Sequence, residues 1–296
     1  MKGFFKGVAT ALITPFSENG VNFHTLEELI ERQIAAGASA VVILGTTGEP
    51  AAMTEEEREQ ALRFAVRRVN GRIKVIAGAG GNCTASAVAA AKMCEDAGAD
   101  GLLAVTPYYN KCTQKGLVAY YEAIANASRL PLIAYNVPSR TGVNILPETM
   151  ARIAEIPSVA GIKEASGNMA QVMETARLIR GVCDLYSGED ALNLPVLAAG
   201  GAGVISVVSN LAPRRVKALC DAVFAGRLNQ AQAISDSLLP LTKACFTEVN
   251  PIPVKEGMNL LGYDAGLPRA PLTPLEEGNR RILQEALAAL NTEVHA

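Results

Sequence analysis

The stretch Val159-Ala160-Gly161-Ile162-Lys163-Glu164-Ala165-Ser166-Gly167 has the apolar pattern of a buried β-strand, except that it carries a lysine. Side chains alternate across a strand, so Gly161, Lys163 and Ala165 should share one face. These small neighbours would leave room for a ligand beside the amine. Lysine is almost never fully buried without a partner or a function, and a desolvated amine becomes nucleophilic near neutral pH. On this stretch alone a plainer interpretation stays open, namely a lysine that reaches solvent or pairs with Glu164.

Seven other apolar runs resemble this stretch, and amphipathic helical patterns separate them at intervals of roughly 20 to 35 residues. Most runs are continuously hydrophobic, as expected for strands that helices cover on both faces. We therefore predict an α/β fold, a (β/α)8 or TIM barrel. An open, doubly wound sheet is disfavoured because no Gly-x-Gly-x-x-Gly turn follows the first run. The predicted strands are residues 7–14, 39–45, 74–80, 101–107, 130–137, 159–165, 184–188 and 203–209.

Helix start and stop signals lie between the predicted strands. Thr25 and Thr54 each begin a capping-box pattern, and the helices that they open should end at Gly37 and Gly71. Apolar residues recur at helical spacing inside both segments. The other predicted helices are residues 84–97, 114–128, 147–155, 169–179, 190–199, 213–224, 229–244, 251–261 and a last helix that ends near residue 290.

Only helical patterns follow Pro213. One of these helices should close the barrel, and the others would form a helical appendage on its outside, a candidate surface for self-association. We therefore divide the chain into a barrel at residues 1–226 and a C-terminal helical region at residues 227–296. The length of 296 residues suits one barrel of this kind.

The bulk composition narrows the function classes. A net charge of −2 gives no electrostatic reason to expect nucleic acid or an anionic membrane as a partner, and no apolar run is long enough to span a membrane. The six cysteines are scattered without metal-ligand spacing, which favours free thiols in a reducing, cytoplasmic compartment. The sequence contains only two histidines, which disfavours a histidine-rich metal site and a Ser-His-Asp triad. We expect no metal and no cofactor.

In a (β/α)8 barrel the active site lies at the C-terminal ends of the strands, and several predicted strands end in polar groups. The second ends in Gly45-Thr46-Thr47-Gly48-Glu49, a tight turn whose backbone N–H groups could bind a carboxylate or phosphate, although it is also an ordinary turn before a helix. The fourth ends near Tyr109, the fifth contains Tyr135, and Arg140 follows the fifth. Taken singly, core packing of the tyrosines and a surface salt bridge of the arginine are the simpler interpretations.

Together the strand ends offer a nucleophilic amine, phenols, hydroxyls, an anion-binding turn and an arginine. This set suits carbonyl chemistry through a lysine imine. The amine condenses with a ketone, the protonated imine accepts electrons, and hydroxyl groups move the protons. A 2-oxo acid is the expected substrate, because its carboxylate could bind the amides of the turn at residues 45–49.

Five segments of the sequence carry a further signal through their order and spacing. They are Gly45-Thr46-Thr47-Gly48-Glu49, Thr106-Pro107-Tyr108-Tyr109-Asn110, Tyr135-Asn136-Val137-Pro138-Ser139-Arg140-Thr141-Gly142, Gly161-Ile162-Lys163-Glu164-Ala165 and Asn250-Pro251-Ile252-Pro253-Val254-Lys255. Together they resemble the dihydrodipicolinate synthase family, and the resemblance covers essentially the whole chain. The first and fourth occur in looser form in N-acetylneuraminate lyase and other pyruvate-dependent aldolases, whereas the third and fifth are typical of the synthases.

The resemblance implies that Lys163 forms a Schiff base with pyruvate. The pyruvyl group then condenses with L-aspartate 4-semialdehyde to give 4-hydroxy-tetrahydrodipicolinate, on the diaminopimelate route to lysine. Tyr135, Thr46 and Tyr109 would form a proton relay, in which Tyr109 reaches into a neighbouring subunit of a homotetramer. The implied substrate-binding groups are Thr47 for the pyruvate carboxylate, Arg140 for the semialdehyde carboxylate, and Gly188 and the Ile205 backbone to complete the pocket.

The chain departs from the family pattern where some members bind lysine as an inhibitor. Such members use a polar groove near a tyrosine and an asparagine, which correspond to Tyr108 and Asn82. However, Arg58, Ser86 and Pro50 stand where these members often have histidine, glutamate and serine. Without an acidic partner for the amine of lysine, we expect weak or no feedback inhibition.

Two other functions stay open. A pyruvate-dependent lyase that acts on N-acetylneuraminate or a keto-deoxy sugar acid would have less need of Arg140, which suits a short carboxylated aldehyde. A catalytically silent barrel that binds a metabolite is disfavoured because Lys163 and the relay tyrosines are intact.

Overall fold

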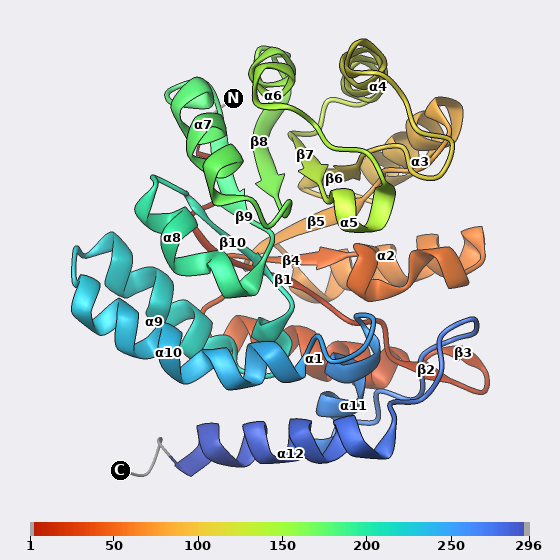
Figure 1. Ribbon diagram of the computed structural model, residues 1–296. Coiled ribbons are helices and arrows are strands. Elements are labelled where there is room, and N and C mark those ends of the chain that lie inside the picture. Colours follow the sequence, from red (N-terminus) through yellow and green to blue (C-terminus); the bar gives the residue numbers. More distant parts are fainter. Residues whose placement is uncertain (1–2, 293–296) are drawn as a thin grey trace.

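The computed structural model describes residues 3–292, with side chains to residue 290, and contains a closed barrel of eight parallel strands (Figure 1). The strands follow one another around the barrel in chain order, and β1 closes it by pairing with both β4 and β10. The predicted fold class and all eight predicted strands are confirmed. The strands are β1 (Gly7–Ala11), β4 (Ala40–Ile43), β5 (Lys74–Gly78), β6 (Gly101–Val105), β7 (Leu132–Asn136), β8 (Val159–Glu164), β9 (Asp184–Ser187) and β10 (Gly203–Ser206).

Helices follow each strand and cover the outside of the barrel (Figure 1). Every residue of β4, β7 and β8 is buried, which explains why these strands are mostly apolar rather than alternating, apart from Asn136, Lys163 and Glu164 at their C-terminal ends. The helices that follow the barrel strands are α1 (Phe23–Ala35), α2 (Glu55–Val69), α3 (Thr84–Asp96), α4 (Gln114–Ala127), α6 (Pro147–Ala154), α7 (Met169–Ile179), α8 (Asn193–Ala198) and α9 (Pro213–Phe224).

One of the two predicted capping boxes is wrong. Helix α1 begins earlier than expected, because the side chain of Asn22 accepts the backbone N–H of Thr25 and occupies the N-cap position. Thr25 itself is buried inside the first turn. The capping box at Thr54 is confirmed, since its hydroxyl accepts the N–H of Glu57 while the Glu57 carboxylate accepts the N–H of Thr54.

Three short elements were not predicted. A hairpin of β2 (Phe16–Ser17) and β3 (Gly20–Val21) follows β1, and α5 (Pro138–Thr141) follows β7. Each has four residues or fewer, too few to show a helical or alternating period. Short loops at strand ends carry function in barrels of this type, and α5 carries Arg140.

The C-terminal region contains α10 (Leu228–Ala244), α11 (Ile252–Leu260) and α12 (Glu277–Thr292), and α12 packs against the other two (Figure 1). We expected this region on the outside of the barrel. Parts of it also reach the strand ends, where Asn250 and Lys255 contact the turn that follows β4. The division of the chain at residues 226 and 227 stays a prediction.

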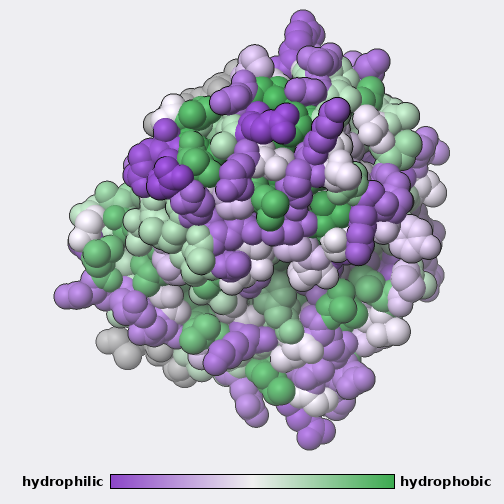
Figure 2. Space-filling model, turned by 45° about the horizontal axis from the view of Figure 1, so that its top comes forward, coloured by the Kyte–Doolittle hydropathy of each residue, from purple (hydrophilic) through white to green (hydrophobic). Residues whose placement is uncertain are grey.

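The surface is mixed. Figure 2 shows hydrophilic side chains interspersed with separate hydrophobic patches on the face it presents. Within the described residues 3–292, no helix combines the length and the hydrophobicity needed to cross a membrane.

Candidate active site

Lys163 lies in β8 and is buried, with 6% of its surface exposed. Among residues 3–292 its amine forms no hydrogen bond or ion pair, and it lies 3.9 Å from the ring centroid of Tyr135 on the neighbouring strand β7. The pKa of Lys163 is lowered to about 7, chiefly by loss of solvation and in part by the charge of Arg140, whereas Asp190 and Glu189 act in the opposite direction. The amine therefore exists largely without its proton just above neutral pH, as a nucleophile requires.

The neighbours of Lys163 differ in part from expectation. A Cβ at Gly188 would lie 2.7 Å from Cε of Lys163, so this glycine makes room for the lysine side chain. A Cβ at Gly161 would lie 2.6 Å from the Tyr186 ring, so the space beside Gly161 belongs to Tyr186 and not to a ligand. The expectation that Gly161 leaves room for a ligand is therefore wrong.

Glu164 does not pair with Lys163, because it points to the opposite face of β8. Its carboxylate accepts the backbone N–H of Ser166 at 2.6 Å and the side-chain amides of Asn136 and Gln171 at 3.1 and 3.3 Å. Burial raises the pKa of Glu164, although these hydrogen bonds oppose the rise. The alternative of a Lys163–Glu164 pair is wrong, which leaves the amine available.

Tyr135 is buried beside the lysine, and its hydroxyl interacts with the side chain of Thr46. Burial raises the pKa of Tyr135 to about 12, while the charge of Arg140 and the interaction with Thr46 moderate the rise. A phenol in this state keeps its proton at neutral pH and can pass it along a hydrogen-bonded chain. The structure thus brings Lys163, Tyr135 and Thr46 together.

The turn after β4 is fixed on several sides. It forms a 3-10 turn over Thr46–Gly48, in which Thr47 is buried and its hydroxyl accepts a 3.0 Å hydrogen bond from the Asn250 amide. The hydroxyl of Thr14 donates to the Gly48 carbonyl at 2.7 Å. A turn held in this way presents its remaining groups in one geometry, which a carboxylate-binding site requires.

A cavity of about 620 Å³ opens above this turn, between the ends of β4 and β7 and the C-terminal region. Thr46, Tyr135, Arg140 and Asn250 line it, whereas Lys163 lies one side chain away, beside Tyr135. The Arg140 guanidinium donates to the Asn250 carbonyl at 3.0 Å and is otherwise exposed at the cavity. It can therefore meet an anionic group of a bound molecule.

Three of the predicted site residues do not line the cavity. Tyr109 is 90% exposed and has a left-handed backbone (φ +69°), so its ring points away from this chain's own barrel. Ile205 is buried in β10, and Gly188 lies at the end of β9 against Lys163. Tyr186, a further candidate phenol, has its hydroxyl engaged with the Phe5 carbonyl at 3.0 Å.

Sequence reasoning assigned no role to Asp190 or Asn250. One carboxylate oxygen of Asp190 accepts the backbone N–H groups of Val207 and Val208 at 2.8 and 3.0 Å, and the other accepts the Ser206 hydroxyl at 2.5 Å. Asp190 thus orders the loop after β10. Of the two carboxylates that raise the pKa of Lys163, it has the larger effect. Its position directly after Gly188-Glu189 was visible in the sequence, but its partners were not.

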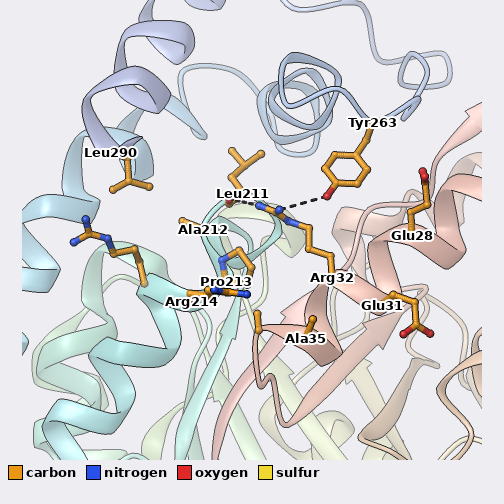
Figure 3. A pocket seen from close by; sticks show the side chains of 12 residues that line it. Glu28, Glu31, Arg32, Ala35, Leu211, Ala212, Pro213, Arg214, Tyr263 and Leu290 are labelled. Carbon is orange, nitrogen blue, oxygen red and sulfur yellow. Dashed lines mark hydrogen bonds between the residues drawn. The ribbon is translucent and has the colours of Figure 1, made fainter. Parts of the chain in front are cut away.

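A second hollow lies outside the barrel, between α1 and the start of α9, and has a volume of about 530 Å³ (Figure 3). Its central guanidinium, Arg32, donates to the Leu211 carbonyl at 2.8 Å and to the Tyr263 hydroxyl at 3.4 Å. None of the predicted catalytic groups lines it. Within residues 3–292, no cluster of three or more His, Cys, Asp or Glu side chains is placed to hold a metal ion.

A closed (β/α)8 barrel that holds a desolvated lysine on β8, without an ion pair among residues 3–292, beside a phenol and a constrained turn, has the arrangement expected of barrels that form a Schiff base with their substrate. Comparison with known proteins narrows this class. The chain belongs to the Dihydrodipicolinate synthetase family, whose sequence profile matches residues 4–290.

Individual relatives agree over nearly their whole length. The chain is 49% identical to the 4-hydroxy-tetrahydrodipicolinate synthase of Alkaliphilus oremlandii, over 97% of this chain and 99% of that protein. It superposes with a TM-score of 0.94 on a chloride-inhibited dihydrodipicolinate synthase from Acinetobacter baumannii in complex with pyruvate, at 40% identity over 97% and 99% of the two chains. The dihydrodipicolinate synthase of Cyanidioschyzon merolae with lysine bound has the same TM-score, at 39% identity over 97% and 99%.

Proposed function

We propose that this chain is a lyase that condenses pyruvate with L-aspartate 4-semialdehyde to give 4-hydroxy-tetrahydrodipicolinate, through a Schiff base on Lys163. The observation that carries the proposal is the desolvated Lys163 amine, without an ion pair among residues 3–292 and with a pKa lowered to about 7. The name of the Alkaliphilus relative and the pyruvate bound to the Acinetobacter neighbour support the reaction and the first substrate.

In the first step the neutral amine attacks the keto carbon of pyruvate, and the former keto oxygen takes up a proton and leaves as water, so that a protonated imine remains. The carboxylate of pyruvate binds at the 45–49 turn, where Thr47 is held by Asn250. Gly188 and the Ile205 backbone complete this part of the pocket. Removal of a methyl proton then turns the imine into an enamine, with the electrons held by the imine nitrogen.

The proton moves through Tyr135, beside the amine, and Thr46, whose side chain interacts with the Tyr135 hydroxyl. Tyr109 of a neighbouring subunit ends the relay, which suits its 90% exposure on its own chain. We therefore propose that the chain forms a homotetramer. The donation of Tyr109 to the active site of a neighbouring subunit requires at least a dimer. Sedimentation of the purified chain tests this, and a monomer with full turnover would remove Tyr109 from the relay.

In the second half of the reaction the enamine carbon attacks the aldehyde of the second substrate. Arg140 binds the carboxylate of that substrate at the rim of the cavity. The amine of the substrate then attacks the imine carbon, which closes the ring and releases Lys163 as the free amine. One carbon–carbon bond forms, and the bond between the Lys163 nitrogen and the imine carbon is replaced by a bond from that carbon to the nitrogen of the second substrate.

Borohydride reduction with pyruvate tests the proposal, because it converts the imine into a stable secondary amine that peptide mass mapping can locate. We expect the adduct on the Lys163 peptide and none on the Lys255 peptide, which is the internal control for a buried lysine. If the Lys163 peptide stays unmodified, the mechanism is wrong. A coupled assay that compares aspartate semialdehyde with sugar aldehydes identifies the second substrate.

We also propose that free lysine inhibits this chain weakly or not at all, although the Cyanidioschyzon neighbour has lysine bound. Pro50, Arg58 and Tyr108 line the cavity, so the Arg58 cation would repel the amine of lysine there, and Ser86 stands in place of the glutamate that would pair with that amine. Half-inhibition by lysine at micromolar concentration would contradict this proposal.

A further inference from the structure

The chain contains a second buried lysine, and we propose that this residue, Lys255, acts with Glu49 to position pyruvate. Neither residue contacts the reacting atoms in the mechanism above. They act through the turn at residues 46–48, whose end Glu49 fixes. The inference rests on the proposed function, since it assigns pyruvate to that turn.

The pair is enclosed and short. The Lys255 amine lies 2.7 Å from one carboxylate oxygen of Glu49, and the two side chains are 0% and 2% exposed. Breaking a buried pair by removing one partner leaves an uncompensated charge, so neither side chain can move away freely. The pair joins positions that lie 206 residues apart in the chain, one after β4 and the other in α11.

Both partners are held from further sides. The second carboxylate oxygen of Glu49 accepts the backbone N–H of Arg269 at 2.9 Å. The Lys255 amine lies 4.0 Å from the ring centroid of Phe16, and the Arg269 guanidinium carbon lies at the same distance from that ring. Cations near an aromatic ring are stabilised by its quadrupole, and this places both groups around one fixed ring. Glu49 therefore has a single position open to it.

This position determines the turn. Glu49 directly follows the 3-10 turn, donates its backbone N–H to the Thr46 carbonyl at 3.2 Å, and has a left-handed backbone with φ of +56°. A residue other than glycine keeps this conformation only when its surroundings impose it. Loss of the ion pair would release the strain and let Thr46 and Thr47 leave their present geometry. The buried pair thus imposes the shape of the turn.

The same C-terminal segment also contacts Thr47 directly. Asn250, five residues before Lys255, donates its amide to the Thr47 hydroxyl and accepts the Arg140 guanidinium at its carbonyl. Lys255, through Glu49, and Asn250, through Thr47, therefore hold the turn at two points. Arg140 contacts Asn250 but neither member of the ion pair. We expect the pair to affect pyruvate binding more than binding of the semialdehyde.

The test uses full-length Lys255→Met, Glu49→Gln and the double variant. We measure KM for each substrate, kcat, and the pyruvate concentration that gives half-maximal borohydride trapping on Lys163. The expected result is a rise of about tenfold or more in the pyruvate KM and in the trapping concentration, with kcat within about threefold of the wild type. Arg280→Met is the matched control, because it breaks the neighbouring, partly exposed pair of Arg280 with Glu256, and should leave pyruvate binding unchanged.

The double variant keeps the test decisive if the single variants do not fold, because it buries no unpaired charge. Its pyruvate KM should stay raised although its melting temperature recovers. A soluble double variant with wild-type pyruvate binding, or variants that lose kcat alone, would overturn the inference. If the wild type itself forms no adduct on Lys163, the proposed function fails. If the wild type traps pyruvate and the variants trap it equally well, only the role of the pair fails.

Discussion

The chain buries two lysines near the mouth of the barrel, and they differ in what surrounds their amines. Lys163 has an aromatic ring beside it and, among residues 3–292, no ion pair. Lys255 has a ring beside it and a carboxylate, Glu49, at 2.7 Å. Desolvation lowers both pKa values, but that of Lys163 to about 7 and that of Lys255 only to about 8, because Glu49 opposes the effect of burial.

The difference shows that burial alone does not make a lysine a nucleophile. The Lys163 amine has no ion pair among residues 3–292, so its burial favours the neutral form, whereas the Glu49 carboxylate at 2.7 Å favours the charged form of the Lys255 amine. The charged form is the one that pairs with a carboxylate, and the neutral form is the one that attacks a ketone. Lys163 is therefore suited to form an imine, whereas Lys255 is suited to hold its carboxylate partner in place.

The largest expected effect separates the two lysines by activity. Lys163→Met should abolish pyruvate trapping and lower kcat by at least about a thousandfold, because no other group can form the imine. Lys255→Met should still trap pyruvate on Lys163 at saturating concentration. Turnover and peptide mapping on both variants check this. A Lys163→Met protein that forms the same borohydride adduct elsewhere would break the comparison.

The same two substitutions should change stability in opposite directions. At pH 7 and below, wild-type folding forces the Lys163 amine to lose solvation, so Lys163→Met should raise the free energy of unfolding by about 2–5 kcal/mol. Lys255→Met should lower it by about 3–5 kcal/mol, because the buried carboxylate of Glu49 is left without its ion-pair partner. Melting temperatures at pH 7 give the signs directly.

The pH dependence sharpens this result. Between the folded pKa of about 7 and the usual lysine value of 10.5, the unfolded chain binds more protons at Lys163 than the folded chain does. Wild-type stability from this group therefore rises with pH across that window, and the advantage of Lys163→Met shrinks to nothing near its upper end. An advantage that stays constant from pH 7 to pH 10 would contradict the lowered pKa.

Sequence reasoning found one of these lysines and missed the role of the other. Lys163 stands out because an apolar strand has no local use for a lysine. Lys255 lies in a helix, where lysine is an ordinary residue, and its partner Glu49 is 206 residues away. The sequence pattern reveals a residue whose type is unusual for the strand or helix that contains it. It does not reveal a contact between two segments that lie far apart in the sequence.

The same limit explains the errors close to the site. Strand alternation correctly placed Gly161 and Lys163 on one face, but only the position of the Tyr186 ring on β9 shows what fills the space at Gly161. At α1 the helix is capped by Asn22 rather than by Thr25, and the Asn22 amide also donates to the distant Asp264 carboxylate at 3.0 Å, a contact that has no local signal. Periods and motifs thus determined the elements and the barrel, while competition between neighbours required coordinates.

A smaller effect should follow from Arg140, which influences Lys163 without touching it. Its charge lowers the pKa of Lys163, so Arg140→Ala should move the pH midpoint of pyruvate trapping upward, while trapping at high pH is retained. The KM for the semialdehyde should rise by about tenfold to a hundredfold with the loss of a carboxylate partner. Trapping rates from pH 6 to pH 9 give the midpoint. An unchanged midpoint together with an unchanged semialdehyde KM would remove the assigned role.

The smallest effect concerns the ring beside Lys255. Phe16→Leu keeps an apolar side chain but removes the ring that faces the Lys255 amine and the Arg269 guanidinium at 4.0 Å each. Such contacts contribute about 0.5–2 kcal/mol, so the melting temperature should fall by a few degrees and the pyruvate KM should rise only slightly. Because the ion pair remains, this change should be much smaller than that of Lys255→Met. An equal loss in both variants would mean that the ring, and not Glu49, holds Lys255 in place.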